Sequence, residues 1–211
     1  MNEIARAELA SSPAGARAMT SWTRLLRDRR GASAVEFALI VPLMLVMYLG
    51  TLELGQGIET NKKVGRSASM VGDLVTQEAQ VTSSDLDGIL GIGKAILQPY
   101  NRSEPTLEVV GITVSTASPP VATVLWSRKL TAGNFDRGTA PGTVVVLPGS
   151  LNTAGAFVVK VNGGLDYQPL MTWNSTDANK IGYKAWFPNL PMQETYYLRP
   201  RMSTVIPCTD C

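Results

Sequence analysis

The chain has 211 residues, 45% apolar and 17% charged, and this composition excludes disorder as a description of the whole chain. The formal net charge is +2, and it is unevenly placed: residues 1–31 hold six arginines and three acidic residues, whereas the remainder holds 13 basic and 14 acidic residues. A nearly neutral body argues against nucleic-acid binding, because phosphate recognition needs a basic surface.

The sequence contains no histidine. Histidine is the commonest general base and zinc ligand, so its absence also excludes nucleophiles of the Ser-His and Cys-His type. Asp166, Asp177 and Glu194 are available carboxylates, but no spacing marks them as an acid/base pair. We therefore expect no enzymatic activity, no cofactor and no metal site.

The first 31 residues are interpreted as a basic cytoplasmic leader. Residues 1–23 are small and polar, and a cluster of arginines then precedes a long apolar stretch. The arginines of this cluster are Arg24, Arg27, Arg29 and Arg30. Positive charge beside a hydrophobic span stays in the cytoplasm, so the N-terminus is predicted to lie inside and the C-terminal domain in the periplasm.

An apolar stretch runs from Ala32 to Leu52 and is interrupted only by Glu36 and Pro42. A helix needs roughly 20 residues to cross a hydrocarbon core of about 30 Å. We expect a transmembrane helix over residues 32–53, kinked at Pro42, where one backbone hydrogen bond is lost. A signal anchor and a cleaved secretory signal are the simpler interpretations of this segment.

The helical pattern does not stop where the apolar stretch stops. Apolar side chains continue at helical spacing at Leu54, Ile58, Val64, Ala68, Val71 and Val75. Five glycines follow the same helix: Gly50, Gly55, Gly57, Gly65 and Gly72. They favour either close packing against a neighbour or local flexibility. One long helix is predicted, from Ala32 to about Gln80.

A second helix is predicted from Asp85 to Leu97. Ser83-Ser84-Asp85 supplies an N-cap and early negative charge, and Pro99 stops the helix.

After Pro105 the apolar period changes to alternation, which indicates strands. Strands are predicted at 110–114, 121–130, 143–147, 156–162 and 194–206, with a loop at 131–142, a turn at Asn162-Gly163-Gly164 and an irregular, aromatic-rich segment at 166–192. Pro200 cannot donate to a ladder, so the last strand is expected at an edge or bulged.

The predicted fold is therefore α+β. A long N-terminal transmembrane helix extends into an extracytoplasmic domain, residues 54–211, with a second helix and a mainly antiparallel sheet of about five strands.

Glu36 needs a separate explanation, because a plain anchor has no use for a carboxylate within its apolar stretch. A charge inside a bilayer costs a few kcal/mol and is a functional hypothesis by default. The simpler interpretation is that Glu36 lies near the cytoplasmic interface and reaches it at little cost. A cation presented by another subunit inside the membrane would also offset the cost.

The residues around Glu36 resemble the N-terminal motif of TadE/TadG-like pilus assembly proteins, the pseudopilins of tight-adherence (Flp-type) pilus and secretion systems. The resemblance rests on Arg29-Arg30-Gly31, on Glu36-Phe37, on the apolar run through Pro42 and on Glu53-Leu54-Gly55, and it covers roughly residues 29–75. Tyr167-Gln168-Pro169 and Leu198-Arg199-Pro200-Arg201 are more loosely similar to the C-terminal half of these proteins.

The resemblance implies cleavage by a prepilin peptidase between Gly31 and Ala32, which would put Glu36 fifth and Phe37 sixth in the product. Glu36 would then contact the α-amino group of a neighbouring subunit. Other implied partners are further pilins or pseudopilins, the inner-membrane assembly platform and membrane lipid. The long leader and large outer domain favour a minor subunit of a type IVb pilus. A single-pass periplasmic sensor or ligand-binding domain is the alternative, with residues 166–192 lining a pocket.

The only cysteines, Cys208 and Cys211, have Cys-x-x-Cys spacing. A normal zinc site needs two ligands in addition to these cysteines, and the chain has no histidine or further cysteine to supply them. A redox-active pair is typically found at the start of a helix, whereas this pair lies in the last four residues. A structural disulfide in an oxidising periplasm is the expected state, with modest stabilisation from so small a loop; an intermolecular bridge stays open.

Overall fold

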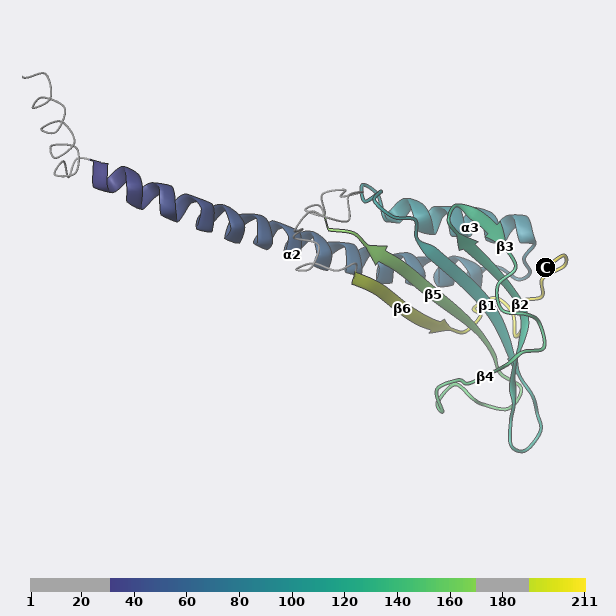
Figure 1. The fold of residues 1–211 in the computed structure, drawn as a ribbon. Coiled ribbons are helices and arrows are strands. Elements are labelled where there is room, and N and C mark those ends of the chain that lie inside the picture. Colours follow the sequence, from purple (N-terminus) through teal and green to yellow (C-terminus); the bar gives the residue numbers. More distant parts are fainter. Residues whose placement is uncertain (1–30, 170–189) are drawn as a thin grey trace, which may run out of the picture. The chain divides into compact units, whose positions relative to one another are not determined.

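The computed structural model of the chain describes residues 31–169 and 190–211. Its elements are the helices α2 (Ala32–Gln77) and α3 (Ser83–Ile96) and the strands β1 (Thr106–Val114), β2 (Ala122–Thr131), β3 (Asn134–Asp136), β4 (Val144–Val145), β5 (Phe157–Tyr167) and β6 (Leu190–Leu198) (Figure 1). The predicted α+β fold is confirmed, with six strands in its antiparallel sheet. The chain divides into two compact units at Gly50/Thr51, and each is described separately below.

Helix α2 runs without interruption through Pro42 and ends at Gln77, three residues before the predicted Gln80. In the unit that starts at Thr51, one face of this helix enters the protein core. The apolar stripe predicted there is buried from Val64 to Val75, whereas Leu54 and Ile58 remain 66% and 51% exposed. The stripe is therefore a core face only where the sheet lies beside it.

Helix α3 starts two residues earlier than predicted. Thr82, rather than a residue of 83–85, is the N-cap: its side chain accepts a hydrogen bond from the backbone N–H of Asp85, whose carboxylate accepts one from the backbone of Thr82. This reciprocal pair is a capping box, which satisfies two backbone donors that a helix start leaves free. The buried face of α3 includes Leu86 and Leu90.

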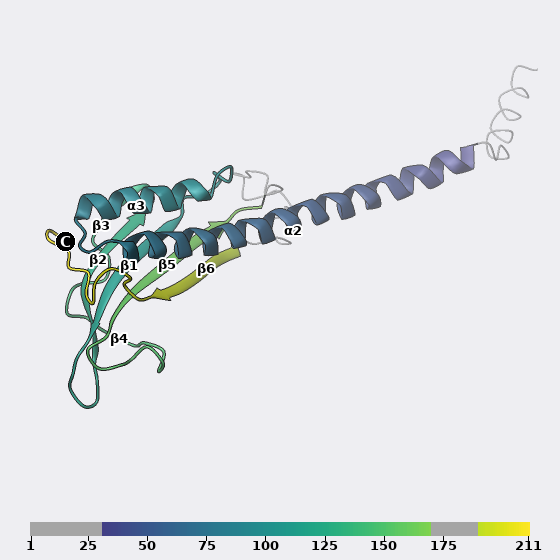
Figure 2. The same ribbon diagram turned by 180° about the vertical axis from the view of Figure 1, so that it is seen from behind.

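The sheet has the order β3-β2-β1-β5-β6, and β4 also pairs with β2; all described pairings between strands are antiparallel. Helices α2 and α3 lie side by side over one face of the sheet, as Figure 1 and the opposite view in Figure 2 both show. The main core fills the layer between them. Its members are Ala68, Val71, Val75, Val81, Leu86, Leu90, Leu107, Val109, Trp126, Leu130, Phe157, Val159, Val161 and Ile206.

The other face of the sheet has two different halves. A second apolar cluster covers one half, where Leu147 and Val145 pack against residues of β1, β2 and β5. The other half is polar and open. The sheet is therefore apolar on both faces only at the end where the β4 segment covers it.

Gly163 overturns the prediction of a turn at Asn162-Gly163-Gly164. Strand β5 continues through these residues to Tyr167 and pairs with β1 on one side and β6 on the other. A Cβ atom at Gly163 would lie 3.1 Å from the Cβ of Ala68 in α2. The missing side chain lets the helix approach the strand closely, so this glycine serves packing and not a turn.

Two smaller predictions for the strands are also corrected. The predicted loop 131–142 contains β3, which pairs with the end of β2. The last strand was predicted at 194–206 but lies at Leu190–Leu198, and its predicted edge position is confirmed. It ends before Pro200, which has no N–H for a ladder.

The chain after β6 turns toward the helices. The backbone N–H of Arg201 donates to the carbonyl of Thr76, and the Trp126 indole N–H donates to the carbonyl of Ile206 at 2.7 Å. Met202, Thr204 and Ile206 therefore do not continue the strand face predicted for them. Most of the predicted irregular segment, with Trp173, Tyr183, Trp186 and Phe187, lies outside the described residues.

Candidate membrane assembly site

The candidate processing segment lies at the start of α2. Gly31 immediately precedes the helix, which begins at Ala32, and an added Cβ at Gly31 would meet nothing within 4 Å. Glu36 is exposed and Phe37 is 69% exposed. Within the described part of the chain, Glu36 forms no hydrogen bond or ion pair. The carboxylate is thus available to a group from another molecule.

Glu36 shares one helix face with a series of residues in the same unit. Leu43, Met47 and Gly50 follow it at intervals of seven, four and three residues, the spacing of a seam between packed helices. Leu43 is 59% exposed, Met47 is 61% exposed, and nothing lies within 4 Å of a Cβ added at Gly50. This face ends at a small residue that would let a second backbone approach closely.

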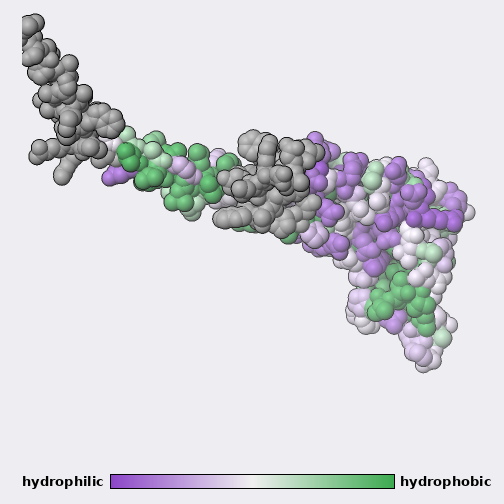
Figure 3. Space-filling model, viewed as in Figure 1, coloured by the Kyte–Doolittle hydropathy of each residue, from purple (hydrophilic) through white to green (hydrophobic). Residues whose placement is uncertain are grey.

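The helix that carries this face is suited to a bilayer. Among the described residues, one helix, Ser33–Gln77, is long and apolar enough to cross a membrane. Large apolar side chains between Val35 and Leu49 are exposed, and Figure 3 shows a green band at the start of α2. An N-terminal apolar helix followed by a folded domain is the organisation of a single-pass membrane anchor. The four arginines predicted to orient it, Arg24, Arg27, Arg29 and Arg30, lie outside the described residues.

A buried carboxylate marks the point where α2 enters the second unit. Glu53 is 6% exposed, and its Oε1 accepts a hydrogen bond of 2.5 Å from the hydroxyl of Tyr167, which is 3% exposed. Burial, together with this bond to Glu53, raises the pKa of Tyr167 to about 12. Glu53-Leu54-Gly55 and Tyr167-Gln168-Pro169, separate segments in the sequence, therefore meet at the end of β5.

Three residues for which the sequence analysis predicted no role, Gln56, Tyr100 and Arg102, complete this cluster. The Tyr100 ring stacks on the Tyr167 ring with centroids 5.5 Å apart, and the Arg102 guanidinium lies over both rings. Arg102 also donates to Gln56 of α2 at 2.9 Å, and the backbone N–H of Gln168 donates to the Tyr100 hydroxyl at 2.8 Å. We call Glu53, Gln56, Tyr100, Arg102 and Tyr167 the helix-exit cluster; it ties α2 to the loop before β1 and to the end of β5.

The C-terminal residues close the opposite end of the helices. Arg201 forms an ion pair with Asp73 of α2. The Asp210 carboxylate accepts hydrogen bonds from the backbone N–H and the hydroxyl of Ser83 at the start of α3. Cys208 and Cys211 are joined in a disulfide, with Cα atoms 5.7 Å apart, on either side of Thr209 and Asp210. The short disulfide loop therefore presents a carboxylate to a helix N-terminus, where negative charge is stabilising.

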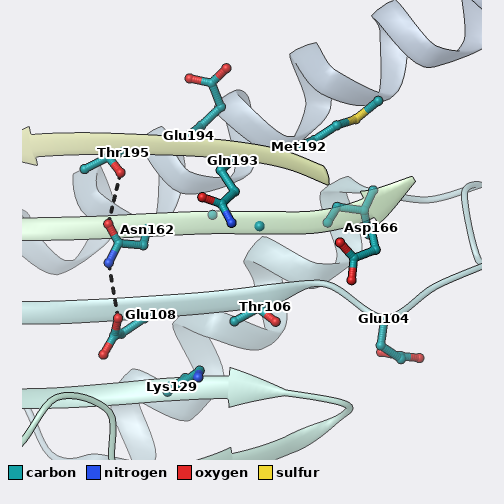
Figure 4. Close-up of a pocket in the computed structure, with 13 residues that line it drawn as sticks. Glu104, Thr106, Glu108, Lys129, Asn162, Asp166, Met192, Gln193, Glu194 and Thr195 are labelled. Atoms are coloured by element: carbon teal, nitrogen blue, oxygen red, sulfur yellow. Dashed lines mark hydrogen bonds between the residues drawn. The ribbon is translucent and has the colours of Figure 1, made fainter. Parts of the chain in front are cut away.

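A shallow pocket of about 450 Å³ lies on the polar half of the open sheet face (Figure 4). A row of hydrogen bonds crosses it from Thr195 to Asn162 and from Asn162 to Glu108. Burial opposes ionisation of Glu108, but hydrogen bonds from Thr139 and Asn162 lower its pKa below the ordinary value. The carboxylate is already satisfied by these partners, so the row braces the strands.

The carboxylates considered for catalysis do not form a pair in this pocket. Asp166 lies opposite Pro191 and Glu194 lies opposite Gly163 in the β5–β6 ladder. Positions 191 and 194 are three residues apart on one strand, so the two carboxylates point to opposite faces of the sheet. In Figure 4 the Glu194 side chain is directed toward the helix side and away from Asp166. Asp177 lies outside the described residues.

Comparison with known proteins gives one match. No curated protein and no solved structure matches the chain. Residues 31–71 match the model of a family described as TadE-like protein. The match begins at Gly31 and includes Glu36, Phe37 and Glu53, the residues on which the resemblance to TadE/TadG-like pilus assembly proteins was based. Residues 31–71 of this chain are thus similar to the TadE-like family, in agreement with the resemblance noted in the sequence.

Proposed function

We propose that this protein is a minor pseudopilin that takes part in assembling a tight-adherence (Flp-type IVb) pilus or a related secretion system. The observation that carries the proposal is the TadE-like match from residue 31, on a helix with an exposed apolar surface. Glu36 interrupts this surface, and its carboxylate has no hydrogen bond or ion pair among residues 31–169 and 190–211. The protein acts as an anchored interaction partner, with its C-terminal domain in the periplasm.

Prepilin peptidase cleaves between Gly31 and Ala32 in this proposal and removes the basic leader. Until then, Arg24, Arg27, Arg29 and Arg30 hold the N-terminus in the cytoplasm. Cleavage creates a free α-amino group at Ala32. The accessible position of Gly31, at the end of α2 and not inside the folded domain, is consistent with this step.

The α-amino group of a neighbouring subunit is the proposed partner of Glu36. A charged side chain at the centre of a membrane helix costs about 3 kcal/mol. Two opposite charges about 4 Å apart attract each other by about 4 kcal/mol at an effective dielectric constant of about 20. Pairing can therefore offset the cost of burial, whereas a subunit out of register leaves the charge unpaired. Leu43, Met47 and Gly50 extend the same contact face along the helix.

The protein partners in this proposal are further pilins or pseudopilins and the inner-membrane assembly platform. The Cys208–Cys211 disulfide is an intrachain structural bond of the periplasmic domain in this proposal.

Replacement of Glu36 by Gln tests the proposed contact in cells that make the pilus and lack the native copy. We expect the Glu36→Gln protein to fractionate with the membrane and to fail in pilus assembly, since the amide keeps the shape and removes the charge. Glu59→Gln is the matched control: its side chain is 68% exposed beyond the apolar stretch, and we expect normal assembly. Normal pilus numbers with Glu36→Gln would contradict the proposed role.

N-terminal sequencing of the mature protein tests the processing step. We expect the sequence to begin at Ala32 when prepilin peptidase is active and at the leader when the peptidase gene is deleted. An intact leader in both strains would leave the protein with an anchor function alone.

A further inference from the structure

Two stretches of the folded domain contain no charged residue. Charged residues make up 17% of the chain, yet residues 109–127 and 138–159 contain no Asp, Glu, Lys or Arg. These two stretches pack together: Ile112 pairs with Val158, and Ala122 pairs with Val145. They also supply all the buried residues of the second apolar cluster, beneath β4. We call residues 109–127 and 138–159 the uncharged end.

Valine side chains lie exposed on the outside of the uncharged end. Val146 is 91% exposed, Val144 is 66% exposed and Val121 is 39% exposed. Because Ala122 is the partner of Val145, the next positions along the ladder bring Val121 beside Val146. Figure 3 shows this surface as a green patch on the domain, where Figure 1 labels β4.

The two faces of the β4 segment have different roles. Val145 and Leu147 point inward and pack in the second apolar cluster, whereas Val144 and Val146 alternate with them and point outward. The outer valines contribute nothing to that core, and exposed apolar patches of this kind mark interaction sites.

Strand β4 also has a free edge. It pairs with β2 on one side, and no other strand of the described chain pairs with it. The unpaired N–H and C=O groups of an edge strand are a template for pairing with a strand from another chain. Neither a charged side chain nor a proline interrupts residues 142–147, so the stretch between Pro141 and Pro148 can accept a short partner strand.

The occupant that fits this surface is the same surface of a second copy. Interface cores are depleted of charged residues, so an uncharged, apolar surface with a free edge strand would complement this one. The uncharged end of a second copy meets all three conditions, and two such surfaces carry no like charges that would repel each other. Two identical strands paired antiparallel are related by a twofold axis, the symmetry of most homodimers.

We propose that two copies of this protein associate through the uncharged end, with the β4 edges paired antiparallel and Val144 and Val146 of each copy covered by the other. The contact lies in the folded domain and is independent of cleavage at Gly31 and of Glu36. It gives the protein a second interaction surface, separate from the one on the membrane helix.

Cysteine crosslinking in membranes tests the proposal with the full chain expressed alone, without other pilus components. Both native cysteines are in the disulfide, so Val146→Cys introduces the free thiol. Met202→Cys is the matched control, because Met202 is a 72% exposed apolar residue outside the uncharged end. We expect mild oxidation to give at least fivefold more covalent dimer with Val146→Cys than with Met202→Cys.

A second substitution separates a specific contact from random collision. Val144→Lys in the Val146→Cys chain should reduce the dimer to the level of the Met202→Cys control, because it introduces like charges across the twofold axis. Equal dimer yields from the two single-cysteine chains would overturn the proposal. So would an unchanged yield after Val144→Lys, or a main product whose mass is not twice that of the chain. None of these outcomes bears on Glu36, since no pilus is assembled in this system.

Discussion

Replacing Tyr167 by Phe isolates the bond that closes the helix-exit cluster. The change removes the hydroxyl that donates to Glu53 at 2.5 Å and keeps the ring that stacks on Tyr100. A hydrogen bond to a charged group contributes about 1.5–3 kcal/mol, and removal of one partner leaves a buried group with less compensation. Both side chains are nearly inaccessible, at 3% and 6% exposed, so water cannot replace the donor without disturbing the packing.

We therefore expect Tyr167→Phe to lower the free energy of unfolding by about 2 kcal/mol. The assay is denaturant unfolding of the full chain in detergent micelles, followed by the tryptophan fluorescence of the domain. An unchanged dependence on denaturant concentration would show that the variant unfolds from a similar native state. Tyr197→Phe is the control, because the Tyr197 hydroxyl makes no hydrogen bond within the described residues; we expect a change within about 0.5 kcal/mol. Equal effects of the two substitutions would refute the reasoning.

The burial of Tyr167 and its bond to Glu53 together predict how the stability depends on pH. The pKa of Tyr167 is raised from its ordinary value of 10.0 to about 12 in the folded protein. The folded state therefore favours the protonated hydroxyl, so this contribution is complete below pH 10 and is lost as the pH rises toward 12. Titration by tyrosinate absorbance should show one late-ionising group, and Tyr167→Phe should remove it.

Two further predictions concern packing and the disulfide. Gly163→Ala should destabilise the domain by about 1–3 kcal/mol, because the new methyl group would lie 3.1 Å from Ala68. Gly164→Ala is the control: its nearest atoms are 3.8 Å away, and it should change stability by less than about 0.5 kcal/mol. Thermal unfolding compares the two variants, and equal shifts in their midpoints would contradict the close-packing argument. Replacing Cys208 and Cys211 together by Ser should cost about 2 kcal/mol through the lost loop constraint; a thiol reductant should give the same loss in the native chain and none in the double variant.

Much of the secondary structure could be predicted because its signals are local. Apolar residues at helical spacing predicted α2 and α3 to within three residues, and alternation predicted β1, β2 and the start of β5. The wrong predictions concern residue types that are common in two different kinds of local structure. Asn162-Gly163-Gly164 has the composition of a turn, but β5 has partners on both sides and a helix above Gly163. Pro200 ends β6, so the alternating pattern beyond it belongs to a segment that contacts the helices instead.

The candidate site also has one part that could be predicted from the sequence and one part that could not. Gly31, Glu36 and Phe37 form a linear motif whose spacing is complete in the sequence, and the TadE-like match begins at the same glycine. The helix-exit cluster could not be assembled from the sequence, because Tyr167 and Glu53 are 114 residues apart and Arg102 comes from a third segment. Only folding brings a buried carboxylate next to its donor.

The amino-acid sequence by itself determined the long apolar N-terminal helix, the carboxylate within it and the α+β class, since each depends on composition or on spacing along one segment. The tertiary structure decided which glycine is a packing contact, where β6 ends and how the two uncharged stretches combine into one surface. These features depend on contacts between residues far apart in the chain. Burial and strand pairing determine these features, and neither can be predicted from a single stretch of sequence.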